Sequence, residues 1–148
     1  MPFTVIRALE NMSRFEVTLR NYERPHEAPV SAPRNSGSVE VNWTIPWCTS
    51  PADFNDGHRL VLRTPGAVPQ VLEYSIWQES IPGDGDYVRF THGLAGQTQY
   101  TYGDAAQTSA RKLAANERGT PFEVTDNADV RMQIFNVGTD TWVIIRPL

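Results

Sequence analysis

Hydrophobic and polar residues alternate along several stretches of this chain, with the period of two that is typical of half-buried β-strands. The clearest alternation covers residues 38–45, SVEVNWTI, in which every second residue is apolar. The same period recurs at 14–20 and at 58–64. We expect each of these segments to form a strand with one face on a hydrophobic core.

Residues 71–90, VLEYSIWQESIPGDGDYVRF, predict a strand, an acidic loop and a second strand. In the first arm Leu72 and Ile76 lie on an apolar face and Trp77 lies on the other, polar face. In the second arm Arg89 lies on the polar side. The connecting IPGDGD supplies turn chemistry, because proline fixes φ and glycine permits positive φ. This segment therefore predicts a β-hairpin.

Prolines and turn residues divide the rest of the chain into short strands and loops. Two long proline-containing segments, 21–36 and 46–57, predict loops, and the first can instead hug a sheet edge, because proline cannot donate to a strand ladder. Residues 142–145 are almost wholly apolar and should lie centrally in a sheet. We predict further strands at 3–9, 98–102, 121–125, 130–135 and 142–145.

Residues 104–117 fit two structures. The first is a helix, because Asp104 is a typical N-cap residue and the apolar residues after it recur near helical spacing. Only Leu113 among them is large, so such a helix would bury little surface. The alternative is a loop that enters a short strand at 111–115, and we favour this second structure.

Nine or ten short strands with little helix indicate an all-β fold. We predict a single domain over residues 1–148, built as an antiparallel β-sandwich, with a β-barrel as the alternative. The chain is long enough to bury a sizeable core without disulfides. The inward positions of the predicted strands give the expected core: Phe15, Val17, Leu19, Val39, Val41, Trp43, Leu60, Leu62, Ile76, Val88, Ile134 and Ile144.

The net charge of the chain is −4, and residues 51–86 alone carry six acidic and two basic residues. We therefore expect no nucleic-acid partner and no general attraction to anionic membranes. The single cysteine, Cys48, cannot form an intrachain disulfide, so the fold can persist in a reducing cytosol. The first residues lack the pattern of a signal peptide, which predicts a cytoplasmic protein or one exported without a conventional signal peptide.

Catalytic motifs are absent from the sequence. It contains no dinucleotide or phosphate-binding glycine loop, no nucleophile elbow and no HExxH zinc motif. A lone cysteine beside Trp47 is typical of a small buried residue rather than of a nucleophile. Several carboxylates are available for glycoside hydrolysis, but no spacing selects a pair. We expect a non-catalytic protein without a cofactor, and an enzyme stays open as the less favoured alternative.

Two acidic clusters have the residue types that bind metal ions. Asp53, Asp56 and His58 can bind a divalent ion if their loop turns all three side chains inward. Asp84 and Asp86 match part of a calcium loop, but the full pattern is missing. Asx turns and capping of backbone amides explain the same residues, so we expect no metal.

Aromatic residues beside carboxylates carry the strongest functional signal. Flat aromatic faces suit the C–H faces of sugars, and nearby polar groups can hydrogen-bond the hydroxyls. This combination occurs in the loop at 46–57 and in the hairpin at 71–90. We predict a lectin-like site for a glycan or other neutral ligand, built from Trp47, Asp53, Phe54, Asp56, Trp77, Glu79, Asp84 and Asp86.

Other interpretations of the same residues stay open. The aromatic side chains can equally close the end of a sandwich core. The loops can dock a protein partner or a second copy of the chain, and a homo-oligomer would help a shallow site to bind tightly. A membrane-active β-sandwich toxin is a minor alternative, because exposed Trp and Tyr favour a membrane interface while the acidic window does not.

Overall fold

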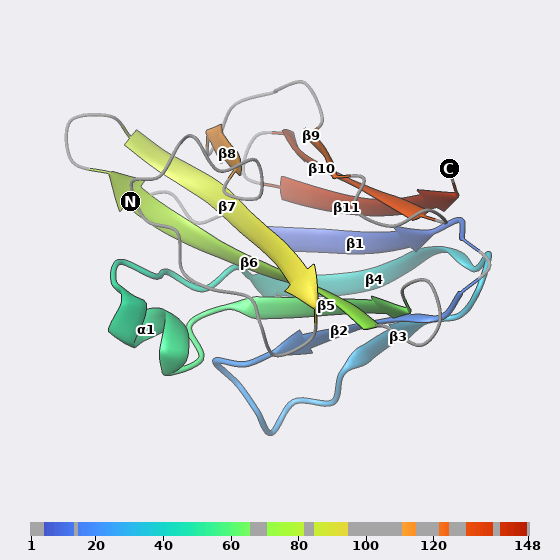
Figure 1. Ribbon diagram of the computed structural model, residues 1–148, viewed down its shortest axis with the longest axis horizontal. Coiled ribbons are helices and arrows are strands. Elements are labelled where there is room, and N and C mark those ends of the chain that lie inside the picture. Colours follow the sequence, from blue (N-terminus) through green and yellow to red (C-terminus); the bar gives the residue numbers. More distant parts are fainter. Residues whose placement is uncertain are drawn as a thin grey trace.

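A computed structural model describes residues 5–13, 15–65, 71–81, 85–94, 111–114, 122–124, 130–137 and 140–147. Within these ranges the chain forms eleven strands and one short helix. The strands make two open sheets that pack together, as Figure 1 shows, and they do not close into a barrel. The predicted all-β sandwich is confirmed, and the barrel alternative is not adopted by the described strands.

The first sheet has five strands. Its order is β4 (Gly37–Thr44), β1 (Val5–Asn11), β11 (Asp140–Pro147), β10 (Val130–Val137) and β9 (Phe122–Val124). Most neighbours are antiparallel, but β1 and β11 pair in parallel. The apolar segment at 142–145 therefore does occupy a central strand, as its composition predicts.

The second sheet has six strands. Its order is β3 (Val30–Ala32), β2 (Val17–Asn21), β5 (Leu60–Pro65), β6 (Val71–Ile81), β7 (Gly85–Leu94) and β8 (Arg111–Ala114). All its described pairings are antiparallel. The predicted hairpin is β6 and β7, and β8 confirms the strand at 111–114. The predicted strand at 98–102 lies outside the described residues, as does most of 104–117.

Each of the two proline-containing segments includes one regular element. Val30–Ala32 forms the edge strand β3, which agrees with the alternative that residues 21–36 hug a sheet edge; prolines at 29 and 33 flank the three residues that pair with β2. Residues 51–55 form a helix, α1 (Pro51–Asn55), inside the predicted loop. With five residues, α1 is far too short to cross a membrane, and it is the one helix in the described ranges.

The core lies between the two sheets and follows the predicted alternation. Most of the predicted positions are buried: Val17, Leu19, Val41, Leu60, Leu62, Ile76, Val88 and Ile144. Phe15, Val39 and Trp43 are partly buried and pack against the same cluster. The side chain of Ile134 lies outside the described part of the chain.

Residues 73–79 of strand β6 are buried on both faces. Tyr74 and Ile76 belong to the core between the sheets, as expected from their face. The opposite face, which the sequence pattern predicts to be polar, carries Glu73 at 2% exposure and Trp77 at 0%. Arg89 on β7, directly opposite Trp77 in register, is 2% exposed. This outer face is therefore buried, although its residues are mostly polar.

Candidate functional site

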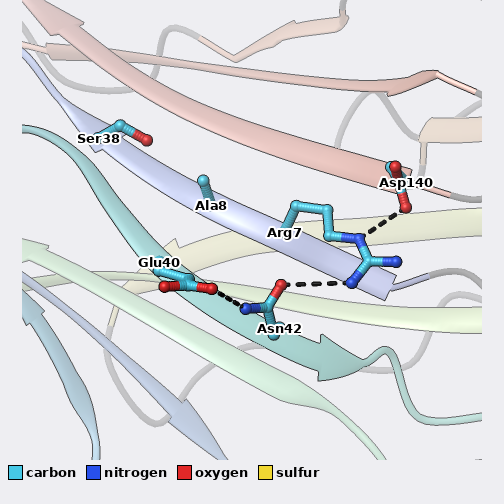
Figure 2. Close-up of a pocket in the computed structure, with 6 residues that line it drawn as sticks. All are labelled: Arg7, Ala8, Ser38, Glu40, Asn42 and Asp140. Carbon is cyan, nitrogen blue, oxygen red and sulfur yellow. Dashed lines mark hydrogen bonds and ion pairs between the residues drawn. The ribbon is translucent and has the colours of Figure 1, made fainter.

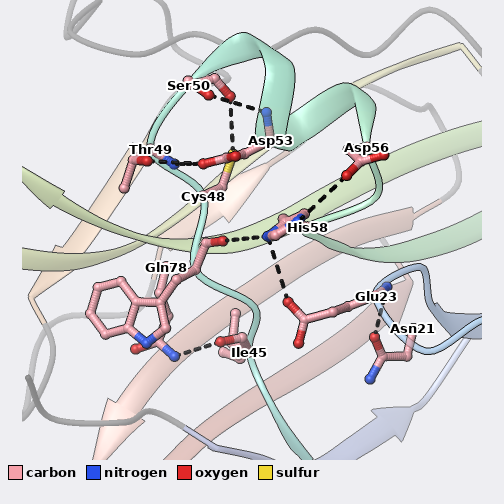
Figure 3. Close-up of polar contacts among 11 residues, drawn as sticks. Asn21, Glu23, Ile45, Cys48, Thr49, Ser50, Asp53, Asp56, His58 and Gln78 are labelled. Carbon is pink, nitrogen blue, oxygen red and sulfur yellow. Dashed lines mark hydrogen bonds and ion pairs between the residues drawn. The ribbon is translucent and has the colours of Figure 1, made fainter.

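The loop that contains α1 joins strand β6 through backbone hydrogen bonds. The amide of Cys48 donates to the Gln78 carbonyl at 2.8 Å, and the amide of Gln78 donates to the Pro46 carbonyl at 2.7 Å. Trp47 thus forms a parallel bridge with Gln78, and the Gln78 side chain donates to the Ile45 carbonyl at 2.6 Å (Figure 3). We call residues 45–59, together with Trp77–Glu79, the α1 joint.

The α1 joint has a small apolar cluster of its own, made by Cys48, Phe54 and Trp77. The rings of Phe54 and Trp77 meet edge to face, with centroids 5.4 Å apart. Burial raises the pKa of the Cys48 thiol to about 11, and the nearby Asp53 and Glu79 charges add to the rise. The thiol is therefore protonated at neutral pH and is a packing group rather than a nucleophile.

A buried ion pair lies beside this cluster. Nη1 of Arg89 donates to Oε2 of Glu79 at 2.6 Å, with side-chain exposures of 2% and 0%. The indole Nε1 of Trp77 donates to the other Glu79 oxygen at 3.2 Å. Both oxygens of the carboxylate are thus held by protein donors, which is the usual condition for burying a charge.

Arg59 fixes the loop from its other side. Its guanidinium lies 4.2 Å from the Phe54 ring centroid and 5.0 Å from that of Tyr22, a cation–π contact with each ring. Its Nη1 also donates to the Phe54 carbonyl.

Gly57 adopts φ of +91°, and a Cβ there would come within 2.8 Å of the Tyr22 carbonyl oxygen. This close approach requires glycine.

The acidic residues of the loop make local contacts. The Ser50 hydroxyl caps α1 by accepting a hydrogen bond from the Asp53 amide. The Asp53 carboxylate accepts hydrogen bonds from the amide and the hydroxyl of Thr49, at 3.1 and 2.9 Å. These hydrogen bonds lower the pKa of Asp53. Figure 3 shows His58 between Glu23 and Asp56, at 3.8 and 4.0 Å from their carboxylates.

Asp53, Asp56 and His58 have the residue types of a metal site. Within the described residues, no group of three or more His, Cys, Asp or Glu side chains is placed to hold a metal ion. The Asp53 carboxylate accepts from the Thr49 amide, and the Asp53 amide donates to the N-cap Ser50, so both contacts belong to the start of α1.

The structure brings the two predicted site segments together, but it buries much of the predicted site. Phe54, Trp77 and Glu79 are 0–2% exposed, so their surfaces are taken up by the protein itself. Trp47 and Asp53 are half-buried and Asp56 is exposed. Asp84 lies outside the described residues. Asp86 pairs with Ser80 in the β6–β7 ladder, and its side chain lies outside the described part of the chain.

A different polar surface lies on the outer face of the five-stranded sheet. There a shallow depression of about 460 Å³ crosses β4, β1 and β11. Figure 2 shows its lining residues, which we call the β1 depression: Arg7, Ala8, Ser38, Glu40, Asn42 and Asp140.

A β-bulge gives the β1 depression its shape. Between Ile6 and Ala8 the register of β1 shifts against both β4 and β11. Ile6 and Leu9 both point into the core with 0% exposure, whereas Arg7 and Ala8 both line the depression. Asn42 opposite the bulge has φ of +56°, a left-handed conformation that asparagine tolerates better than most residues. Bulges commonly redirect side chains next to functional sites.

The polar groups of the depression form one chain of contacts across three strands (Figure 2). Nε of Arg7 donates to Oδ1 of Asp140 at 2.7 Å, and Nη1 of Arg7 donates to the Asn42 side-chain oxygen at 3.3 Å. The Asn42 amide nitrogen in turn donates to Glu40. Arg7 and Asp140 remain 44% and 38% exposed, so these groups can still reach a ligand.

The sequence held partial signals for this surface. Ser38, Glu40 and Asn42 are the polar face of the clearest alternating segment, so their exposure was expected. Arg7 and Asp140 are 133 residues apart, and only the parallel pairing of β1 with β11 brings them together. Nothing in a period of two indicates a bulge or a parallel partner.

Comparison with protein-family models, with curated proteins and with solved structures found no match to this chain.

Proposed function

We propose that this protein is a non-catalytic binding module of lectin type, which recognises a hydroxylated ligand such as a carbohydrate at the β1 depression. The observation that supports this most is the chain of contacts Asp140–Arg7–Asn42–Glu40 in an open depression. Carboxylate, amide and guanidinium groups held side by side offer donors and acceptors to neighbouring hydroxyls.

The charged lining groups have hydrogen-bonding capacity left for a ligand. The guanidinium of Arg7 has five N–H donors, and two of them are used within the described residues. The carboxylates of Asp140 and Glu40 can each accept several hydrogen bonds. Ala8 presents a small apolar contact at the floor of the depression, which suits the C–H face of a sugar ring.

The affinity of a single depression should be modest. Its volume falls at the low end for ligand pockets, and an open site buries only part of a ligand. A homo-oligomer that presents several copies would raise the apparent affinity without new contacts.

The test is a glycan array followed by calorimetry on the full chain, with and without calcium. Arg7→Met should weaken binding at least about tenfold, because it removes hydrogen bonds from a charged donor, each worth about 1.5–3 kcal/mol. Arg20→Met is the matched control, since Arg20 is an exposed arginine on β2 in the other sheet. Binding that survives Arg7→Met, or no binding to any glycan, would contradict the proposal.

The α1 joint is a second candidate surface for the same ligand class. It is favoured by the exposure of Asp56 and the half-exposure of Trp47 near it in the chain. In the same assay Trp47→Ala separates the two surfaces. Loss of binding in Trp47→Ala, with binding retained in Arg7→Met, would place the site at the α1 joint.

A further inference from the structure

The charges in the β1 depression are not balanced. Its lining contains one cation, Arg7, and two carboxylates, those of Glu40 and Asp140. The guanidinium is already paired with Asp140 at 2.7 Å. The depression therefore keeps a formal charge of −1, which is located on Glu40.

Glu40 has one neutral partner in the described part of the chain. The Asn42 amide donates to its Oε1, and Glu40 forms no ion pair there. Glu40 is exposed, and its second carboxylate oxygen has no partner among those residues, so this oxygen faces solvent. A neutral amide orients a carboxylate but does not compensate its charge.

The Asn42 contact keeps Glu40 in a defined position. The side-chain oxygen of Asn42 accepts from Arg7, so its amide nitrogen must point toward Glu40. The bulge and the left-handed conformation of Asn42 hold this arrangement in place. Glu40 is thus an oriented anion at one end of the depression, and the Arg7–Asp140 pair closes the other end, as Figure 2 shows.

We infer that the ligand of the β1 depression carries a protonated amine, as an amino sugar does, and that Glu40 receives this ammonium group. The inference rests on the proposed function, because it names the ligand class of the same site. An ammonium donor can hydrogen-bond Glu40 while the hydroxyls of the ligand contact Arg7 and Asp140. A carboxylate on the ligand would instead meet an uncompensated negative charge.

The test compares glycans that differ in one group. The array holds oligosaccharides of glucosamine, their N-acetylated forms and uronic acid oligosaccharides, at about pH 6, where the amine of the ligand is largely protonated. The amine form should bind about three to five times more tightly than the N-acetylated form, the ratio expected of an exposed ion pair. The ratio should shrink as salt is added, and uronic acids should bind least.

Glu40→Gln should abolish the preference for the amine over the N-acetylated form, because it removes the negative charge and keeps a side-chain oxygen that can accept from Asn42. Glu16→Gln, at an exposed glutamate near β2, is the matched control and should keep the preference. Equal binding of amine and N-acetyl forms would overturn the inference and leave the proposed function standing. A preference that survives Glu40→Gln would also overturn it. Absence of binding to every glycan would overturn both.

Discussion

The molecule contains two arginine–carboxylate pairs of almost equal length in opposite surroundings. Arg7 and Asp140 are 2.7 Å apart on the outer face of the five-stranded sheet, with side-chain exposures of 44% and 38%. Arg89 and Glu79 are 2.6 Å apart on the outer side of the six-stranded sheet, with exposures of 2% and 0%. The two contact distances are almost equal, so the difference between the pairs lies in what surrounds them.

Solvent decides what each pair can do. An exposed pair contributes little to stability, because water and salt screen it, and its groups remain available to a ligand. A buried pair has lost its hydration, so removing one partner leaves the other charge buried without compensation and lowers the stability strongly. The first arrangement suits recognition, and the second suits the fixing of one conformation in the α1 joint.

The largest effect is expected from breaking the buried pair. Glu79→Gln should lower the free energy of unfolding by about 3–5 kcal/mol, because it leaves the Arg89 charge buried without its anion. Urea denaturation measures this loss. Asp140→Asn is the matched control in the exposed pair and should cost at most about 1 kcal/mol. Similar losses in the two variants would show that the two pairs do not differ as their burial indicates.

The aromatic cluster of the α1 joint should behave as core. Trp77→Ala should cost about 3–5 kcal/mol, since it removes a fully buried ring packed on Phe54. Trp47→Ala should cost less, because Trp47 is half-buried. Circular dichroism and urea titration measure both variants. A Trp77→Ala protein as stable as the wild type would mean that the ring is free to serve a ligand, as the sequence alone suggested.

The smallest effect concerns acid stability in the α1 joint. The Thr49 hydrogen bonds lower the pKa of Asp53 below its ordinary value of 3.8. A carboxyl group with a lower pKa in the folded state stabilises the fold above the unfolded value, and this contribution is lost as the pH falls through the folded value. Thr49→Val removes the hydroxyl hydrogen bond and keeps the larger contribution of the backbone amide, so it should reduce only part of the dependence of the unfolding free energy on pH below about pH 4. An unchanged dependence on pH in this variant would contradict the role of the Thr49 hydroxyl.

The sequence predicted the strands better than their surroundings. The alternation at 38–45 shows which side chains share a face, and β4 follows it. The alternation cannot show what covers each face, so it places Trp77 and Arg89 on a polar side without showing that this side is buried. The missing information is tertiary: the α1 loop packs over this face of β6.

The candidate site was partly predictable for the same reason. Ser50 followed by Pro51 is a helix-start signal, with a capping hydroxyl before proline at the first turn, but five residues are too few for a helical period to appear. The predicted loop and hairpin do come together at Gln78. The β1 depression depends on a bulge and on a parallel pair, which a single sequence does not encode in any local pattern.

The parallel pairing of β1 with β11 also bears on how the chain folds during synthesis. Neighbours in the six-stranded sheet, from β5 to β8, follow one another in the sequence, so they can pair as soon as each leaves the ribosome. Strand β1 can pair with its neighbour β11 only after Asp140–Pro147 has been synthesised. Strand β11 also lies between β1 and β10, so it joins the two parts of the five-stranded sheet. The β1 depression, with Arg7 and Asp140 on those two strands, is therefore completed only after nearly all of this sequence has been translated.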